Sequence, residues 1–126
     1  MDKIIIKPAG APPAAGPYNH GVRVDGLLFC AGQVPILPES GQLIAGDIRA
    51  QTERVLENVK IILQNQGLTL ANVVKTTVFM TDLADFAAMN EVYGRHFTKD
   101  FPARTTVQVA ALPRGASIEI EVVAHY

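Results

Sequence analysis

The chain has 126 residues, 48% of them hydrophobic, which is the length of one domain with enough apolar side chains for a core. Eleven basic residues stand against twelve acidic ones, giving a formal net charge of -1, and the basic residues form no run. A nucleic-acid partner is therefore not expected.

The single cysteine, Cys30, excludes an intramolecular disulfide and any zinc site that needs several thiolates, and it suits a reducing compartment. Near the N-terminus, three consecutive isoleucines are soon followed by Pro8, so the apolar run is too short for a signal peptide or a bilayer span. We expect one cytoplasmic domain over residues 1–126, with no membrane partner.

The first predicted elements are short strands. Residues Lys3–Ile6 are β-rich and precede a loop rich in proline and glycine. A hairpin follows, with strands over 19–24 and 27–31. Asp25 and Gly26 form its turn, because this pair tolerates the positive φ that a two-residue turn requires.

Two helices are predicted from the spacing of apolar residues. From Asp47 onward these recur at intervals of three and four, and Gly67 suits a left-handed helix end. Residues 86–97 repeat this spacing through aromatic and methionine side chains. Between the two helices, the alternating residues 74–80 predict a strand.

Two last strands are predicted over 103–109 and 117–124, joined by a turn-prone segment. The order is then strand, hairpin, helix, strand, helix, strand, strand. This order predicts an α+β fold in which two helices pack on one face of a mixed β-sheet.

Alternation along the last two strands indicates what occupies the second face of the sheet. Arg104 and Glu119 each alternate with an apolar set, so we place both on that second face. The face is not uniformly polar, because 27–31 is apolar on both sides and Val123 lies among the glutamates. The simplest cover is another copy of the chain, so we expect a homo-oligomer.

Arg104 is the first candidate for a functional residue. It begins a strand directly after a loop, where a side chain can be aimed into a cleft, and its guanidinium offers two parallel donors to a carboxylate. Alternatively, Arg104 only neutralises Glu119 or Glu121 across the strand pair. The sequence favours neither interpretation.

Glu119 is the second candidate, because a carboxylate on a largely enclosed sheet face needs a partner or a function. As a general base it can orient and deprotonate a water, or pass a proton to a leaving amine. The alternative is a solvated or salt-bridged strand residue, and spacing does not distinguish Glu119 from Glu121.

Other polar residues have ordinary structural explanations beside functional ones. Tyr18 either closes a pocket or packs on the sheet, and Asn90, in the middle of a helix, is of a kind that normally points to solvent. Cys30 most simply fills the core. No nucleotide-binding or serine-hydrolase motif occurs, so no cofactor is expected. The histidines lack the spacing of metal ligands, so no metal site is predicted at His20, His96 or His125.

Five segments resemble, in order and spacing, the Rid/YjgF family of reactive intermediate deaminases. They cover nearly the whole chain: GPYNHG (16–21), AGQVP (31–35), MNEVY (89–93), FPARTTVQVAALP (101–113) and IEIEVVA (118–124). The combination of FPAR with the IEIE strand is the specific part. The resemblance implies a chorismate-mutase-like homotrimer with three clefts between subunits, which agrees with a covered second face.

The resemblance also implies an activity, the hydrolysis of 2-imino and enamine acids such as 2-iminobutanoate and 2-iminopropanoate to 2-keto acids and ammonia, which protects pyridoxal-phosphate enzymes. By the same resemblance, Arg104 matches the arginine that binds the substrate carboxylate, and Glu119 matches the acid that positions the hydrolytic water. No cofactor is required. Further pocket positions are matched by Tyr18, the Gly32 amide, Asn90 and the Thr106 backbone carbonyl.

The chain departs from the family pattern at two positions, although Arg104 and Glu119 are intact. Ala31 replaces a serine that many members have, and Thr106 replaces a cysteine. Two competing functions belong to other classes. One is a non-catalytic trimer that binds small keto or amino acids as a sensor or interaction module. The other is the ribonuclease or translation-inhibitor activity attributed to some relatives, which the balanced charge and the lack of aromatic-basic patches disfavour.

Overall fold

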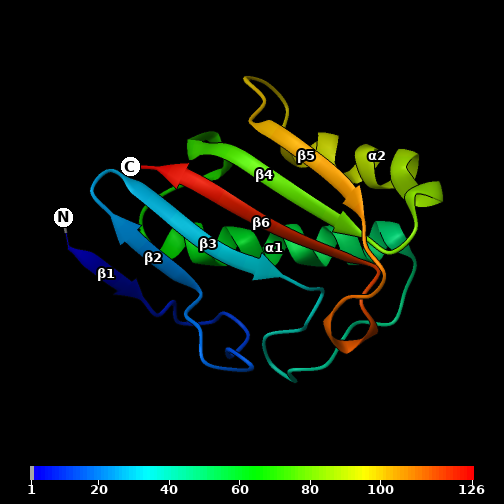
Figure 1. Cartoon of the computed structure of the whole chain (residues 1–126), viewed down its shortest axis with the longest axis horizontal. Helices are drawn as coiled ribbons and strands as arrows, with labels where there is room; N and C mark the ends of the chain where they lie inside the picture. The colour runs from blue at the N-terminus through cyan, green and yellow to red at the C-terminus, as the bar shows by residue number, and fades with distance from the viewer. Residues whose placement is uncertain (1) are drawn as a thin grey trace.

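The computed structural model describes residues 2–126, which form a six-stranded mixed sheet with both α-helices on one face (Figure 1). The strands lie in the order β1-β2-β3-β6-β4-β5, and all neighbours are antiparallel except the parallel pair β4 and β5. The predicted α+β architecture is confirmed. The elements are β1 Lys3–Ile6, β2 Gly21–Val24, β3 Leu27–Gln33, α1 Ile48–Asn65, β4 Val73–Met80, α2 Phe86–His96, β5 Ala103–Gln108 and β6 Ile118–His125.

Helix α1 begins and ends close to where its sequence predicts. The Asp47 carboxylate accepts a hydrogen bond from the Ala50 amide at 3.0 Å, which caps the first turn. After the other end, Gly67 adopts a φ of 71°, a left-handed conformation that glycine takes without strain. Between these ends α1 buries one apolar face against the sheet, with Val55, Leu56, Val59, Ile62 and Leu63 fully or almost fully buried.

The β2–β3 hairpin has the predicted two-residue turn. Val24 pairs with Leu27, and Asp25 takes a φ of 51°. Strand β3 then continues past its predicted end to Gln33, with an irregularity in its pairing to β6 after Cys30. We call residues 31 and 32 the β3 bulge.

The core lies between the sheet and the two helices. Its largest fully buried strand residues are Leu28 from β3, Val78 and Met80 from β4, and Ile118 and Ile120 from β6. Each such side chain contributes roughly 1.5–3 kcal/mol to stability through its burial. Cys30 belongs to the same core, as predicted, and burial raises the pKa of its thiol to about 12.

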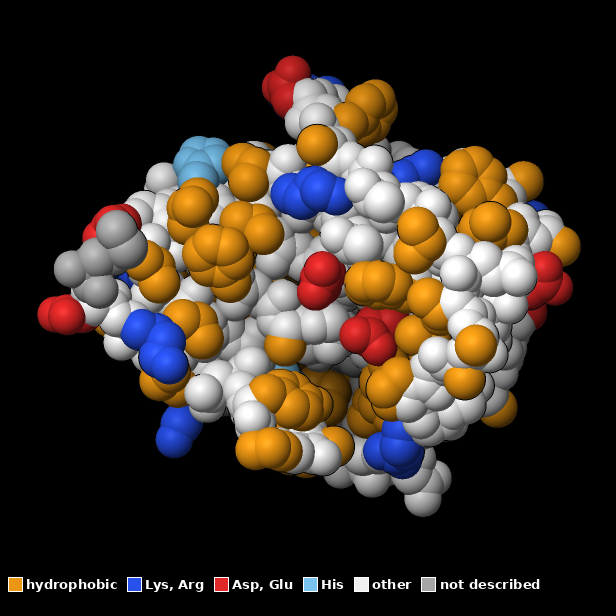
Figure 2. All heavy atoms as spheres, in the orientation of Figure 1, with side chains coloured by type: hydrophobic (Ala, Val, Ile, Leu, Met, Phe, Trp, Pro, Cys, Tyr) orange, Lys and Arg blue, Asp and Glu red, His pale blue; other side chains and the backbone are white. Residues whose placement is uncertain are grey.

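The second face of the sheet is open in the single chain. Figure 2 shows this face, with hydrophobic side chains spread over it and acidic side chains near its middle. Phe29 exposes 44% of its surface, Leu27 40% and Val107 38%. Among residues 2–126 no helix packs here. Apolar side chains exposed together mark a surface that binds another molecule, and its cover by a second copy stays a prediction.

The prediction that Arg104 and Glu119 share a face of the sheet is wrong. Val107 of β5 and Glu119 of β6 both pair with Phe79, so the side chains of all three lie on the open face. Arg104 points to the helix side, where its guanidinium lies over the ring of Tyr93. The reason is that β5 is the edge strand. Its helix-facing side meets only α2, so polar side chains are accommodated there while apolar ones face the open side.

The remaining predicted bounds differ from the observed ones by one or two residues. Three short 3₁₀ turns that were not predicted occur at Leu70–Asn72, Leu83–Asp85 and Pro113–Gly115. In the part of the chain that the structure describes, no helix combines the length and the apolar character needed to cross a bilayer.

Candidate functional site

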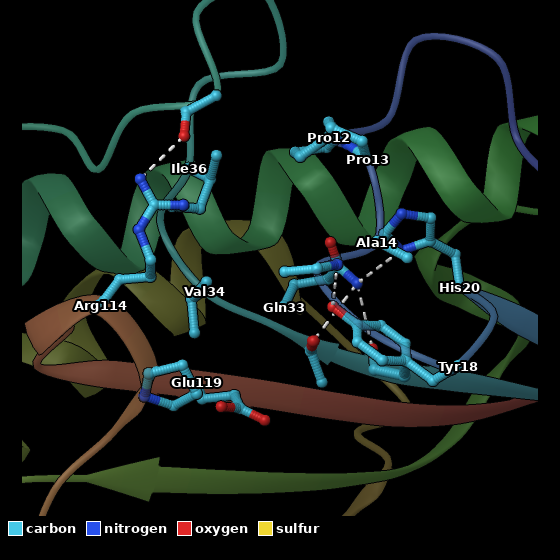
Figure 3. A pocket seen from close by; sticks show the side chains of 15 residues that line it. Pro12, Pro13, Ala14, Tyr18, His20, Gln33, Val34, Ile36, Arg114 and Glu119 are labelled. Carbon is cyan, nitrogen blue, oxygen red and sulfur yellow. Dashed lines mark hydrogen bonds between the residues drawn. The ribbon is translucent and has the colours of Figure 1, made fainter.

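A cleft of about 460 Å³ opens between the proline-rich N-terminal loop, the end of β3 and the start of β6 (Figure 3). Apolar side chains form most of its wall, and its charged residues are Glu119 and Arg114. The cleft brings together three of the residues predicted for the site, although they lie far apart in the sequence. These are Tyr18, Gly32 and Glu119.

Glu119 is the group in this cleft best suited to acid–base chemistry. Its strand β6 runs through the middle of the sheet, between β3 and β4, so its backbone is held on both sides. Partial burial raises the pKa of the carboxyl, and the like charge of Glu121 raises it further. None of the ion pairs among residues 2–126 involves Glu119. A carboxylate with a raised pKa and no cationic partner in its own chain has the properties of a general base.

Residue 32 must be a glycine because there is no space for a side chain beside Glu119. A Cβ at this position would overlap Oε2 of Glu119 and would lie 2.8 Å from its Cδ. Glycine therefore lets the β3 bulge and the carboxylate lie in direct contact. The contact also fixes the backbone of residue 32 at the edge of the cleft.

Gln33 holds the β3 bulge in place, a role that was not predicted. Its Nε2 donates hydrogen bonds to the carbonyl oxygens of Ala31 at 3.2 Å and Gly32 at 3.4 Å. The same nitrogen lies 3.5 Å from Nδ1 of His20. Only 4% of Gln33 is exposed. One feature of the sequence points to this role: Gln33 stands at the end of an apolar strand, and an amide buried there needs hydrogen-bond partners.

Tyr18 and His20 lie at one end of the cleft and Arg114 at the other (Figure 3). The two aromatic rings meet edge to face with centroids 6.2 Å apart, and the Tyr18 hydroxyl accepts a hydrogen bond from the Ala15 amide at 3.2 Å. Nε2 of His20 is buried and has no hydrogen-bond partner among residues 2–126. Arg114 has a φ of 65° and donates to the Gly41 carbonyl at 3.0 Å. Neither His20 nor Arg114 was predicted to line the site.

The other predicted residues lie on the helix side of the sheet, between β5 and α2. The guanidinium of Arg104 is 4.7 Å from the ring centroid of Tyr93 and 5.5 Å from that of Phe86. Tyr93 is fixed in turn by a hydrogen bond of 2.8 Å between its hydroxyl and that of Thr76. Arg104 takes part in none of the ion pairs among residues 2–126. It therefore does not neutralise a strand carboxylate of its own chain.

Asn90 and Thr106 belong with Arg104. Asn90 lies between Phe86 and Tyr93 on one face of α2, because helix residues four and seven apart project to the same side. Thr106 follows Arg104 on the same side of β5, and its hydroxyl is buried without a hydrogen-bond partner in the described chain. The predicted site thus falls into two groups: the Glu119 cleft (Tyr18, Gly32, Glu119) and the Arg104 edge (Asn90, Arg104, Thr106).

Comparison with known proteins identifies the family. The family model described as Endoribonuclease L-PSP matches residues 9–126. The crystal structure of YyfA from Yersinia pestis, a protein of the conserved Rid family, has a TM-score of 0.96 and 42% sequence identity, over 99% of this chain and 100% of that one. The chain belongs to the Rid/YjgF family. The resemblance seen in its sequence and the predicted chorismate-mutase-like fold are thereby confirmed.

Two further Rid relatives carry information about ligands in their names. The 2-iminobutanoate/2-iminopropanoate deaminase of Homo sapiens is 46% identical over 120 residues, which cover 95% of this chain and 88% of the human one. TdcF of E. coli, whose crystal structure contains bound serine, has a TM-score of 0.92 and 43% identity over 98% of both chains. The Rid relatives of this chain thus include a deaminase of small imino acids and a protein that holds an amino acid.

Proposed function

We propose that this Rid chain hydrolyses 2-imino acids and their enamine tautomers to 2-keto acids and ammonia. Mammalian relatives named 2-iminobutanoate/2-iminopropanoate deaminase are 44% to 46% identical to it, which supports these two compounds as substrates. Removal of such reactive imines protects pyridoxal-phosphate enzymes. We expect this activity in the cytoplasm, where the buried free thiol of Cys30 stays reduced.

The observation that carries the proposal is that the Glu119 cleft and the Arg104 edge lie on opposite sides of one sheet. Each contains a charged group that forms no ion pair in its own chain, and the two charges are opposite. Within a single chain they cannot hold the same small molecule. A second copy that covers the apolar open face can bring its Arg104 edge to the first copy's Glu119 cleft. We therefore propose a homotrimer with its sites between subunits.

The two groups divide the chemistry between them. Arg104 anchors the substrate carboxylate through two parallel hydrogen bonds. Once the imine nitrogen is protonated, the neighbouring carbon is electrophilic, and Glu119 holds a water against it and accepts a proton as the carbon–oxygen bond forms. The resulting carbinolamine takes that proton back on its nitrogen. The carbon–nitrogen bond then breaks, ammonia leaves, and Glu119 accepts the proton of the carbinolamine hydroxyl as the keto group forms and then releases it to solvent.

The other predicted residues shape this site without acid–base roles. Tyr18 closes the cleft beside the substrate, and Asn90 supplies a polar contact near Arg104. The Gly32 amide and the Thr106 carbonyl act through the backbone, so the replacement of serine by Ala31 and of cysteine by Thr106 is compatible with turnover.

The direct test is the formation of 2-keto acid from 2-iminobutanoate generated in situ, with two variants beside the wild type. Arg104→Lys keeps the charge but loses the planar fork, so turnover and binding of the unreactive 2-oxobutanoate weaken together, by roughly 1.5 to 3 kcal/mol. Glu119→Gln removes the base, so turnover falls while 2-oxobutanoate binding is retained. If Glu119→Gln loses turnover and 2-oxobutanoate binding equally, Glu119 is not the general base. A wild type that binds 2-oxobutanoate but hydrolyses nothing is the non-catalytic binder instead.

Mixed oligomers test whether each site is shared. Arg104→Met and Glu119→Gln are expected to be inactive alone. When they are unfolded together in equal amounts and refolded, random assembly restores both groups in about one quarter of the sites. Each variant refolded separately is the control. Activity that only averages the two separate values places the whole site in one chain.

RNA should be tested as a second substrate in the same assay series, because the matching family model carries an endoribonuclease description. Glu121 lies next to Glu119 on the open face, and this pair of carboxylates repels phosphate. We expect no RNA cleavage at protein concentrations that hydrolyse 2-iminobutanoate.

A further inference from the structure

The two helices lie on the side of the sheet away from the open face (Figure 1). There, a cluster of three side chains joins α1 to α2. Glu53 and Glu57 lie one turn apart on α1, so their side chains share one face of that helix. His96 is the last residue of α2. One ligand-type atom from each of these three residues lies within 4.8 Å of the other two.

Two of the three atoms lie close to the spacing of metal ligands. Nε2 of His96 is 2.8 Å from Oε2 of Glu53, a hydrogen-bond distance. A tetrahedral Zn²⁺ ion with nitrogen and oxygen ligands at about 2.0–2.2 Å holds neighbouring ligand atoms roughly 3.3–3.6 Å apart, so this pair opens slightly to admit the ion. The side chain of His96 is only 7% exposed, so its ring is fixed by packing. Small rotations of the more exposed Glu53 and Glu57 side chains are then the adjustments needed.

The surrounding cations leave room for an ion. Arg49 and Arg95 line the same hollow as the cluster, but both bind Glu91, at 2.9 and 3.1 Å. Lys60 lies 3.3 Å from Oε1 of Glu57, which leaves the second oxygen of that carboxylate available. Among the described residues, neither arginine forms an ion pair with Glu53 or Glu57.

We propose that Glu53, Glu57 and His96 form a binding site for a divalent transition-metal ion, with Zn²⁺ as the best match. Imidazole with two carboxylates is a recurrent zinc ligand set, and a water completes four-coordination. Mg²⁺ and Ca²⁺ are disfavoured because they select oxygen ligands. The ion clamps the end of α2 to α1. None of its three residues belongs to the Glu119 cleft or the Arg104 edge, so the proposal does not depend on the proposed deaminase activity.

The first measurement is calorimetric titration of the full-length, chelator-treated protein with Zn²⁺, with Mg²⁺ as the comparison ion. We expect one Zn²⁺ per chain. His96→Phe keeps a buried ring but removes the nitrogen, and it weakens binding at least about tenfold, because even the loss of an outer partner of a metal ligand costs that much. Glu53→Gln combined with Glu57→Gln gives the same loss through exposed positions, so the test remains valid if His96→Phe does not fold.

Two matched variants show whether the loss is specific. Glu39→Gln removes an exposed carboxylate that is not in the cluster, and His125→Gln removes an exposed histidine elsewhere. Both should keep the Zn²⁺ affinity. Zn²⁺ should also raise the melting temperature of the wild type and of these controls, but not of His96→Phe. Failure to bind Zn²⁺, or unchanged binding in His96→Phe, overturns the proposal and leaves a simple hydrogen bond between His96 and Glu53.

Discussion

The carboxylate of Glu119 lies directly against the Cα of Gly32, in a space that admits no further carbon atom. A Cβ on residue 32 would be 2.8 Å from Cδ and 3.0 Å from Cγ of Glu119, and closer still to Oε2. The atoms in the way all belong to the Glu119 side chain, so a side chain at position 32 is accommodated by rotating the carboxylate away. The position of the proposed base therefore depends on a residue that has no side chain.

Gly32→Ala is expected to reduce deaminase turnover on the order of 10²-fold, the size expected when an acid–base group is displaced. Substrate binding through Arg104 should change much less, so the loss appears in kcat rather than in KM. Gly94→Ala is the matched control, because nothing lies within 4 Å of a Cβ at that position. It should keep full activity and gain up to about 1 kcal/mol of stability from better helix propensity. Equal turnover in the two variants contradicts the proposed role of the contact.

Glu121→Gln should shift the acidic limb of the kcat/KM profile to lower pH. Glu119 works only when ionised, so activity is lost as the pH falls through its pKa, which burial and the charge of Glu121 both raise above the ordinary 4.5. Removing the charge of Glu121 takes away the second cause, so Glu119 ionises at lower pH. The plateau rate should stay the same. Glu39→Gln, in an exposed loop, is the control. A limb that stays in place or moves upward refutes the assignment of this limb to Glu119.

Phe29→Glu should convert the assembled protein to monomers without unfolding it. Phe29 exposes 44% of its surface on the open face, so a charge is tolerated in the free chain but not in a dry interface. Ile4→Glu is the control. Ile4 is 51% exposed but lies on the same side of β1 as Ile6, which faces the core and not the open face. Light scattering reports the mass, and circular dichroism reports the fold. If the wild type is already monomeric at micromolar concentration, the proposed site between subunits is ruled out as well.

Cys30 should resist alkylation in the folded protein. Burial raises the pKa of its thiol to about 12, so at pH 8 almost none of it is thiolate, the form that reacts. Unfolding returns the pKa to its usual range and exposes the sulfur, so iodoacetamide labelling should follow the denaturant transition seen by circular dichroism. Rapid labelling of native protein would show that strand β3 opens locally.

The sequence indicated the element order and the ends of α1 because these depend on local patterns: apolar spacing, an Asp cap and a terminal glycine. It also singled out Arg104 and Glu119, whose roles stay predictions. The face of Arg104 was predicted wrongly, since alternation along an edge strand is compatible with either side until the register with β4 is known. The pairing of His96 with Glu53 was not visible either, because 43 residues separate them and no spacing rule connects different helices. The role of Gln33 depends on a bulge, which local patterns do not reveal.

The separation of the Glu119 cleft from the Arg104 edge has a consequence for genetics and for dilution. In the proposed ring each copy supplies one half of two different sites, so a single defective copy that lacks both groups is expected to inactivate two sites rather than one. Such a copy, expressed beside the normal one, should behave as a dominant inhibitor. The specific activity of the normal protein should also fall on dilution once the ring dissociates, so the cellular concentration of the chain would set how much of it is active.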